Sequence, residues 1–264
     1  MSPSPGNTAR CYMNWSGGKD SSLCLYRILQ DKSYRVDHLL TNVNSFHNRI
    51  SMHGVRRELL EIQAAAIGIP LQTVELPEQP GMNEYEQGMM EKILLLKNKG
   101  CTHAIFGDIF LEDLRMYREE KLKGLDIRAV FPLWKIPTLQ LMREFLDLGF
   151  KAIIVCVNEK WLDSSFCGRL IDESFLQDLP ENVDPCGENG EYHSFVFDGP
   201  LFSRPVPFQK GGLVYRQYQA PVMSGDSGNS PESGSSDGYV NSGNSCDPVD
   251  RSRRTGFYFI DLLP

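Results

Sequence analysis

The sequence lacks any C-x-x-C pair, and its cysteines are odd in number and scattered. They are Cys11, Cys24, Cys101, Cys156, Cys167, Cys186 and Cys246. This pattern argues against a disulfide framework and against a zinc knuckle. We therefore interpret residues such as Cys24 and Cys156 as small apolar core residues, and we assign no cysteine a catalytic task.

Long apolar runs and a secretory leader are lacking as well. No stretch approaches the roughly 20 apolar residues that span a bilayer, and the opening MSPSPGNTAR has no apolar segment of the signal-peptide kind. The 264 residues are nevertheless 41% hydrophobic, which allows a substantial core. We expect a water-soluble, cytoplasmic protein that contacts no membrane.

Basic residues are outnumbered, with 27 Lys and Arg against 34 Asp and Glu and a formal net charge of -7. Stable binding to a polyanion normally needs a clustered basic face, so we expect no stable nucleic-acid binding. Binding of a single nucleotide is not excluded, because local backbone amides and one or two cations are enough to hold its phosphates.

Apolar runs of strand length alternate with segments of helical periodicity in the first half of the chain. Strands are expected at 10–15, 36–43, 71–76 and 101–106, and helices at 20–30, 53–67 and 83–99. This alternation is typical of a parallel sheet covered on both faces, so we predict a doubly wound α/β fold. Ligands of such sheets bind beyond the carboxyl ends of the strands, where Ser16 and Asp108 fall.

The pattern changes in the second half of the chain, so we place a nucleotide-binding domain at 1–128 and a smaller α+β domain at 129–218. The second domain should contain a helix at 138–148 and a strand at 151–157, followed by a loop-rich stretch.

The segment 219–254 consists mostly of Gly, Ser, Asp, Asn and Pro, and this composition predicts disorder. Residues 255–264 are apolar again. We expect them to return as a strand that pairs with 212–218, which would make the polar tract an enlarged hairpin loop.

A candidate phosphate-binding loop follows the first expected strand. It consists of Ser16, Gly17, Gly18, Lys19, Asp20, Ser21 and Ser22. Glycines let backbone N–H groups approach phosphate oxygens, hydroxyls add donors, and a following helix N-terminus favours negative charge. Lys19 adds a compact cation, and Asp20 could hold Mg²⁺ or cap the helix. The alternative is an ordinary Gly-Gly turn, and the spacing is not that of a Walker A loop.

Residues 16–21 match the SGGKDS signature of the PP-loop ATP pyrophosphatases, and the chain resembles that superfamily here. The resemblance implies a HUP-like fold that uses ATP and Mg²⁺. It also implies cleavage of ATP between the α and β phosphates, adenylation of a substrate oxygen, release of pyrophosphate and displacement of AMP by a nucleophile.

A second segment, residues 184–195, resembles the CGENGEYHTF block of the diphthine–ammonia ligase family, with Ser194 where that family usually has threonine. Further blocks resemble the family in the same order, and together they cover about residues 13–202. These blocks are residues 107–109, the pair Arg115 and Glu119, residues 132–134 and residues 168–172.

The second segment also has a chemical rationale. Glu188, Glu191 and His193 place two carboxylates and an imidazole within six residues, and such a group can orient an amine and accept its protons. We predict these three as catalytic residues together with Lys19 and Asp108. The alternative for the segment is a polar turn.

Arg115, Arg169, Asn189 and Ser194 are the candidate substrate-binding residues. Arg115 could instead be a solvated helix pair with Glu119. Arg169 and Asp172 could equally form a structural ion pair. His47 and His53 are weaker candidates for contacts with adenine, and we interpret Trp134 and Trp161 as core or interface aromatics.

The family resemblance implies an ATP-dependent ligase that adenylates the carboxylate of diphthine on the translation elongation factor and transfers ammonia to it. Two alternatives stay open. One is an adenylating PP-loop enzyme acting on another acid, or on tRNA in thiolation, although thiolation normally needs a cysteine pair and a basic surface. The other is a non-catalytic adenine-nucleotide-binding module, which would have little use for Lys19 beside a second polar cluster at 188–193.

Overall fold

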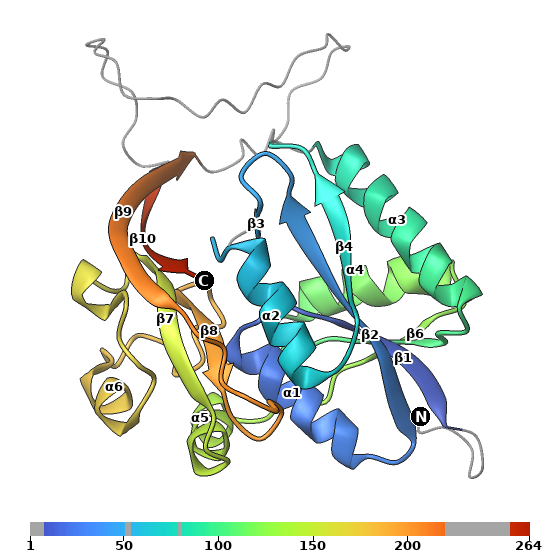
Figure 1. The fold of residues 1–264 in the computed structure, drawn as a ribbon, viewed down its shortest axis with the longest axis horizontal. Coiled ribbons are helices and arrows are strands. Elements are labelled where there is room, and N and C mark those ends of the chain that lie inside the picture. Colours follow the sequence, from blue (N-terminus) through green and yellow to red (C-terminus); the bar gives the residue numbers. More distant parts are fainter. Residues whose placement is uncertain (1–7, 51–53, 79–80, 220–253) are drawn as a thin grey trace, which may run out of the picture.

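The first half of the chain folds around a mostly parallel sheet (Figure 1). A computed structural model describes residues 8–50, 54–78, 81–219 and 254–264. The strands run in the order β3-β2-β1-β5-β6, and β4 also pairs with β2. Only β3 is antiparallel to its neighbour. The strands are β1 (Ala9–Asn14), β2 (Tyr34–Asn44), β3 (Arg49–Ile50), β4 (Leu71–Leu76), β5 (His103–Ile105) and β6 (Arg128–Val130).

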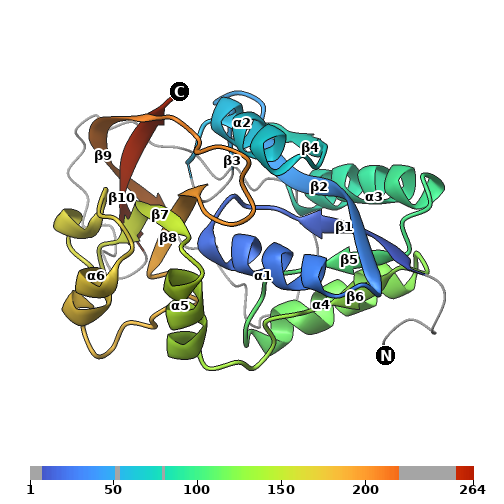
Figure 2. The same ribbon diagram turned by 60° about the horizontal axis from the view of Figure 1, so that its bottom comes forward.

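Helices cover this sheet on both faces, which confirms the doubly wound architecture (Figure 2). One apolar cluster joins the sheet to α1 and α2, and a second joins it to α3 and α4. The faces differ because successive strand residues point to opposite sides: Met13 of β1 belongs to the first cluster and Tyr12 to the second. The helices are α1 (Lys19–Gln30), α2 (Arg57–Ile67), α3 (Met82–Asn98) and α4 (Glu112–Lys123).

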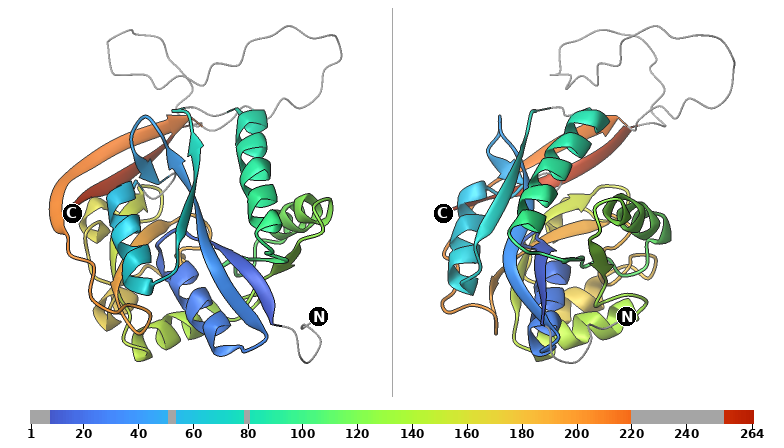
Figure 3. Two further views of the ribbon diagram at one scale, coloured as in Figure 1. Left: turned by 45° about the vertical axis from the view of Figure 1, so that its right-hand side comes forward. Right: turned by 90° about the vertical axis from the view of Figure 1, so that its right-hand side faces the viewer.

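The second half of the chain forms an antiparallel sheet in the order β8-β7-β10-β9. In the left-hand view of Figure 3, its orange and red hairpin lies beside α2, on the side of the molecule away from α3. The elements are α5 (Thr138–Asp147), β7 (Lys151–Asn158), the 3₁₀ turn η1 (Ser164–Phe166), α6 (Glu173–Asp178), β8 (Tyr192–Asp198), β9 (Gln209–Gln219) and β10 (Arg254–Leu263).

Strands β9 and β10 pair along their whole length, with Arg254 opposite Gln219, and this is the hairpin that the apolar segment 255–264 predicts. Residues 220–253, which hold nearly all of the tract expected to be disordered, lie outside the described residues, as does His53. Strand β8 was not expected, since the sequence suggested only a loop-rich stretch there. Strand β6 extends the first sheet to Val130, slightly beyond the predicted domain boundary.

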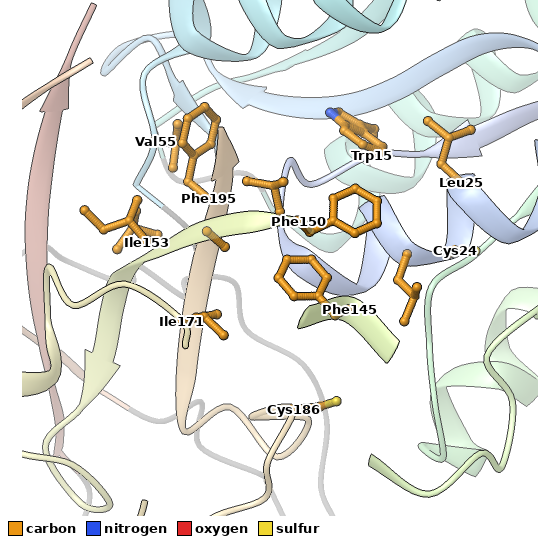
Figure 4. Packing of buried hydrophobic residues seen from close by; sticks show 14 of the residues in the cluster. Trp15, Cys24, Leu25, Val55, Phe145, Phe150, Ile153, Ile171, Cys186 and Phe195 are labelled. Atoms are coloured by element: carbon orange, nitrogen blue, oxygen red, sulfur yellow. The ribbon is translucent and has the colours of Figure 1, made fainter. Parts of the chain in front are cut away.

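A single apolar core joins the two sheets. Figure 4 shows Trp15 and Leu25 of the first half in one cluster with Phe145, Phe150 and Phe195 of the second, and all five side chains are buried. Packing of this kind fixes the second sheet against α1 rather than leaving it on a free linker. Among the described residues, no helix combines the length and apolarity needed to cross a bilayer.

Candidate nucleotide and ligase site

The predicted phosphate loop is a tight turn between β1 and α1. Gly17 has a left-handed backbone, with φ of 76°, and Gly18 follows as the N-cap of α1. The hydroxyls of Ser21 and Ser22 donate to the carbonyl of Gly18 at 2.9 and 3.0 Å. Ser16 Oγ accepts a long hydrogen bond from Gly18 N at 3.3 Å. The serines therefore shape the loop from within, and the start of α1 lies at its rim.

Strand β5 delivers Gly107 directly against this loop. A Cβ atom at position 107 would lie 3.2 Å from the carbonyl carbon of Asp20 and 3.3 Å from Ser21 N. The close backbone contact favours glycine, and it places Asp108 and Ile109 beside the first turn of α1. The carboxyl ends of β1 and β5 therefore meet at the loop, as expected for a parallel sheet.

Lys19 is buried, and its ammonium lies between a carboxylate and an aromatic ring. Nζ is 2.8 and 2.7 Å from the two carboxylate oxygens of Asp20 and 5.3 Å from the ring centroid of Tyr192. Burial is the largest single influence and disfavours the charged form of Lys19. The charge and hydrogen bond of Asp20, together with Tyr192 and Cys186, outweigh it, so the pKa of Lys19 is raised above its ordinary value. Lys19 is therefore a fixed cation at the loop.

Strand β8 brings the second sequence motif to the same loop. Ser194 Oγ accepts a hydrogen bond from Lys19 N at 3.2 Å, and Val196 N donates to the Gly17 carbonyl at 2.9 Å. Although 175 residues separate Lys19 from Ser194 in the sequence, the two family-like motifs form one site.

Glu188 reaches the loop from the turn that precedes β8. Its Oε1 accepts from Ile109 N at 2.8 Å. Burial raises the pKa of Glu188 to about 7, helped by the nearby negative charges of Asp20 and Asp108 and opposed by the Ile109 N–H and Lys19. This carboxyl group can therefore exchange a proton near neutral pH.

Asp108 is held by a residue that the sequence did not single out. Arg118 of α4 pairs with both of its carboxylate oxygens, Nε at 2.9 Å and Nη2 at 3.1 Å. Burial nevertheless raises the pKa of Asp108, and Arg118 opposes that shift. Asp108 therefore lies at the loop, with part of its charge neutralised by Arg118.

Glu191 and Asn189 build the turn itself. Glu191 is almost fully buried, and its carboxylate accepts from Asp184 N at 3.1 Å, Asn189 N at 2.9 Å and Asn189 Nδ2 at 3.1 Å. Glu191 and Asn189 are therefore bonded within the turn, which agrees with the alternative that this segment is a polar turn. Strand alternation places His193 on the face of β8 opposite to Tyr192 and Ser194, and therefore away from Lys19.

The two candidate arginines make local contacts. Arg115 pairs with Glu119 at 2.9 Å and lies over the rings of Phe131 and Trp134. Arg169 pairs with Asp178 at 2.7 Å, within the second sheet domain.

Asp172 is not the partner of Arg169, because it caps α6 by accepting from Phe175 N. His47, a weaker candidate, lies 3.2 Å from Glu78. All of these contacts are local ones, of the kind that stabilises the fold, and none of them is made with the phosphate loop.

Three residues at the site were not predicted from the sequence: Gln63 and Tyr192, which contact loop residues, and Arg118, which contacts Asp108. Gln63 and Arg118 lie in amphipathic helices, where a single polar residue gives no signal. Tyr192 was inside the second motif, but its contact with Lys19 depends on the fold of β8.

Across the described ranges, no three His, Cys, Asp or Glu side chains form a group that could hold a metal ion. Mg²⁺ that accompanies a nucleotide needs only one or two carboxylates, because the phosphates and water supply its remaining ligands. Asp20, at the rim of the loop, offers one carboxylate of this kind, and both of its oxygens face Lys19 Nζ in this structure.

Comparison with known proteins identifies two consecutive domains. Residues 9–126 match the family model of the diphthamide synthase N-terminal domain, and residues 137–217 match that of the diphthamide synthase C-terminal domain. The human diphthine–ammonia ligase is 26% identical over 229 residues, covering 78% of this chain and 85% of that protein. The mouse enzyme gives the same identity and coverage, and the zebrafish enzyme is 25% identical over 170 residues, covering 58% of this chain and 66% of its own length. With both family domains present in order, the chain belongs to the diphthine–ammonia ligase family.

Proposed function

We propose that this protein is an AMP-forming ligase that uses ATP to activate a carboxylate and ammonia to convert it into an amide. The observation that carries the proposal is the meeting of two motifs: Ser194 on β8 binds the backbone of Lys19, and Glu188 lies beside Asp20 and Asp108. A nucleotide-binding module without chemistry would not need the second cluster.

In the first step, a carboxylate oxygen of the acceptor attacks the α-phosphorus of ATP. A new P–O bond forms, the bond between the α-phosphorus and the bridging oxygen breaks, and pyrophosphate leaves. Lys19 and the N-terminus of α1 offer a fixed cation and backbone N–H donors to the developing charge. Mg²⁺, held by Asp20 and the phosphates, would supply further charge neutralisation when bound.

In the second step, the nitrogen of ammonia attacks the acyl carbon of the acyl adenylate, and AMP leaves with the electrons of the broken C–O bond. Ammonia must lose protons as the amide forms. Glu188 is the group best suited to accept one, because its raised pKa, about 7, makes it a competent base near neutral pH. Asp108, held by Arg118, contributes negative charge that stabilises the positive charge developing on the nitrogen as ammonia attacks.

The family relatives are named diphthine–ammonia ligases, and we extend that substrate to this chain: the acceptor is diphthine, a modified histidine of the translation elongation factor. The partners are therefore ATP, ammonia and a protein substrate, and the place of action is the cytoplasm. No nucleic acid takes part in this scheme.

The test is to incubate the purified protein with Mg-ATP, ammonium and an elongation factor that carries diphthine, and to measure AMP and pyrophosphate. We expect both products to depend on the acceptor and to fall by about 100-fold in Lys19→Ala, because the fixed cation is lost. Lys160→Ala, which removes an exposed lysine, serves as the matched control. Tight ATP binding without AMP in the presence of the acceptor would contradict the proposal and favour the non-catalytic module.

A further inference from the structure

Gln63 of α2 is an amide side chain enclosed between the phosphate loop, β1 and β8. It is fully buried. Its Oε1 accepts from Trp15 Nε1 at 2.7 Å, and its Nε2 donates to the carbonyl oxygens of Gly17 at 3.1 Å and Val196 at 2.7 Å. The side-chain oxygen and both amide hydrogens therefore have partners.

Only one orientation of this amide satisfies its surroundings. The indole N–H of Trp15 can only donate, and the two backbone carbonyls can only accept. A flipped amide would place its NH₂ against the indole and its oxygen against two carbonyls, leaving buried groups unpaired at a substantial cost. The three neighbours therefore specify an amide rather than a carboxylate at position 63.

The Gly17–Gly18 peptide is oriented by these contacts. The Gly17 carbonyl accepts from both Gln63 Nε2 and Val196 N, so two donors hold it towards the protein interior. In a planar trans peptide the C=O and N–H groups point in opposite directions, and no described peptide bond is cis. The N–H of Gly18 is therefore directed away from Gln63, towards Ser16 Oγ, which accepts a long hydrogen bond from it at 3.3 Å.

Without this anchor the peptide could turn over. Gly17 has no Cβ atom, and glycine adopts the alternative backbone conformations at little cost. A turned peptide would break the contact of the Gly18 N–H with Ser16 Oγ and place a carbonyl oxygen where the phosphate loop now has an N–H donor. The fit is close, since a Cβ atom at position 17 would lie 2.9 Å from Gln63 Oε1.

We propose that Gln63 is a positioning residue that fixes the Gly17–Gly18 peptide in its phosphate-binding orientation and links the loop to β8. The inference rests on the proposed function in requiring that the loop bind ATP. It adds a residue outside both sequence motifs that acts through the backbone of Gly17 without contacting the substrate itself.

The test compares Gln63→Glu and Gln63→Met with the exposed control Gln140→Glu, by calorimetric titration with Mg-ATP and with adenosine, which has no phosphates. At pH 8 we expect Gln63→Glu to weaken Mg-ATP binding at least about tenfold, since a carboxylate faces two carbonyls. Adenosine binding should stay within about twofold of wild type, because only the phosphate contacts change. Gln63→Met should show the same phosphate-specific loss.

Acid should partly restore Gln63→Glu but not Gln63→Met. At pH 5.5 the buried carboxyl group is protonated and can donate one hydrogen bond, so the defect in Mg-ATP binding relative to wild type should shrink several-fold. A role confined to stability would weaken both ligands alike and show no such recovery. Equal losses for Mg-ATP and adenosine, or no loss in either Gln63 variant, would overturn the inference.

Trp15→Phe provides a variant that keeps an aromatic ring in the core and removes only the donor to Gln63 Oε1. We expect a loss of about threefold in Mg-ATP affinity, with adenosine unaffected. If wild type itself fails to bind Mg-ATP, the proposed function falls together with the inference. If wild type binds and all three variants bind equally well, only the positioning role of Gln63 is refuted.

Discussion

Burial gives individual charged residues at the site their chemical character. Lys19 keeps its charge inside the protein because Asp20, with smaller contributions from Tyr192 and Cys186, offsets the cost of burial, whereas burial drives Glu188 towards its neutral form. Lys19 therefore stays charged across the neutral pH range, whereas Glu188 gains or loses its proton near neutral pH.

The pH dependence of ligase activity should reflect the protonation of the Glu188 carboxyl group. Below pH 7 its carboxyl group is protonated and cannot accept a proton from ammonia, so the rate of amide formation should rise through about pH 7. Glu188→Gln should lower kcat by about 100-fold and abolish this limb of the profile. Steady-state rates from pH 5.5 to 8.5 at saturating ammonia check it, and an unchanged limb in the variant would assign the titration to another group.

The same residue should reduce stability at high pH. The pKa of Glu188 is higher in the folded state than the ordinary 4.5, so the folded protein binds more protons and its stability falls as pH rises from about 4.5 to 7. Glu188→Gln should therefore increase the free energy of unfolding at pH 8 by up to about 3 kcal/mol and have little effect at pH 4.5. Urea unfolding at both pH values measures this, with the exposed Glu181→Gln as control.

Two contacts between secondary-structure elements hold the parts of the molecule together. Gly107 at the end of β5 lies against the first turn of α1, and Asp261 of β10 pairs with Arg49 of β3 at 2.8 Å and with Arg56, the N-cap of α2, at 2.7 Å. The first contact fixes the loop, and the second ties the last strand to the first half of the chain.

Gly107→Ala should disturb α1, because the new methyl group would meet backbone atoms of Asp20 and Ser21 that cannot move independently. We expect a loss of about 1–3 kcal/mol in unfolding free energy together with weaker ATP binding. Gly124→Ala is the matched control, since its Cβ would have only one neighbour, at 3.9 Å. Equal behaviour of the two variants would show that β5 and α1 can separate without cost.

Asp261→Asn tests the connection between β10 and the first half of the chain. Hydrogen bonds from Arg56, together with Arg49, lower the pKa of Asp261 to about 2. Its contribution to stability is therefore present above about pH 4 and is lost as pH falls towards 2. After allowance for partial exposure, we expect the variant to lose about 1 kcal/mol at pH 7. Thermal unfolding measures it, and Asp178→Asn at the Arg169 pair should change little.

Features formed by one continuous segment could be predicted from the sequence, whereas features that depend on the packing of the whole molecule could not. Most strands and helices of the first half are continuous segments with clear periodicity, so pattern alone located them, but β3, α4 and β6 were not predicted. Strand β8 was missed because its first residues also belong to a polar motif that reads as a turn. The partners of Gln63 lie at positions 15, 17 and 196, and only the packing of both sheets brings these together.

Replacing residues 220–253 by a two-residue Asn-Gly turn tests whether that tract contributes to function. Gln219 and Arg254 face each other across the β9-β10 hairpin, so a short turn can join them. We expect AMP formation to remain within about twofold of wild type, and the melting temperature to be unchanged or a few degrees higher. Loss of acceptor-dependent AMP with ATP binding intact would instead give the tract a role in recognising the protein substrate.

The position of β10 has a consequence for biosynthesis. β10 lies between β7 and β9 at the centre of the second sheet, yet it is translated long after β7. At about 5–20 residues per second, the ribosome needs on the order of 5–20 seconds to proceed from one strand to the other. Throughout that interval the nascent chain carries β7 with one edge unpaired, and such an edge invites aggregation. The second sheet therefore exposes an unpaired strand edge to other chains for several seconds while the protein is being made.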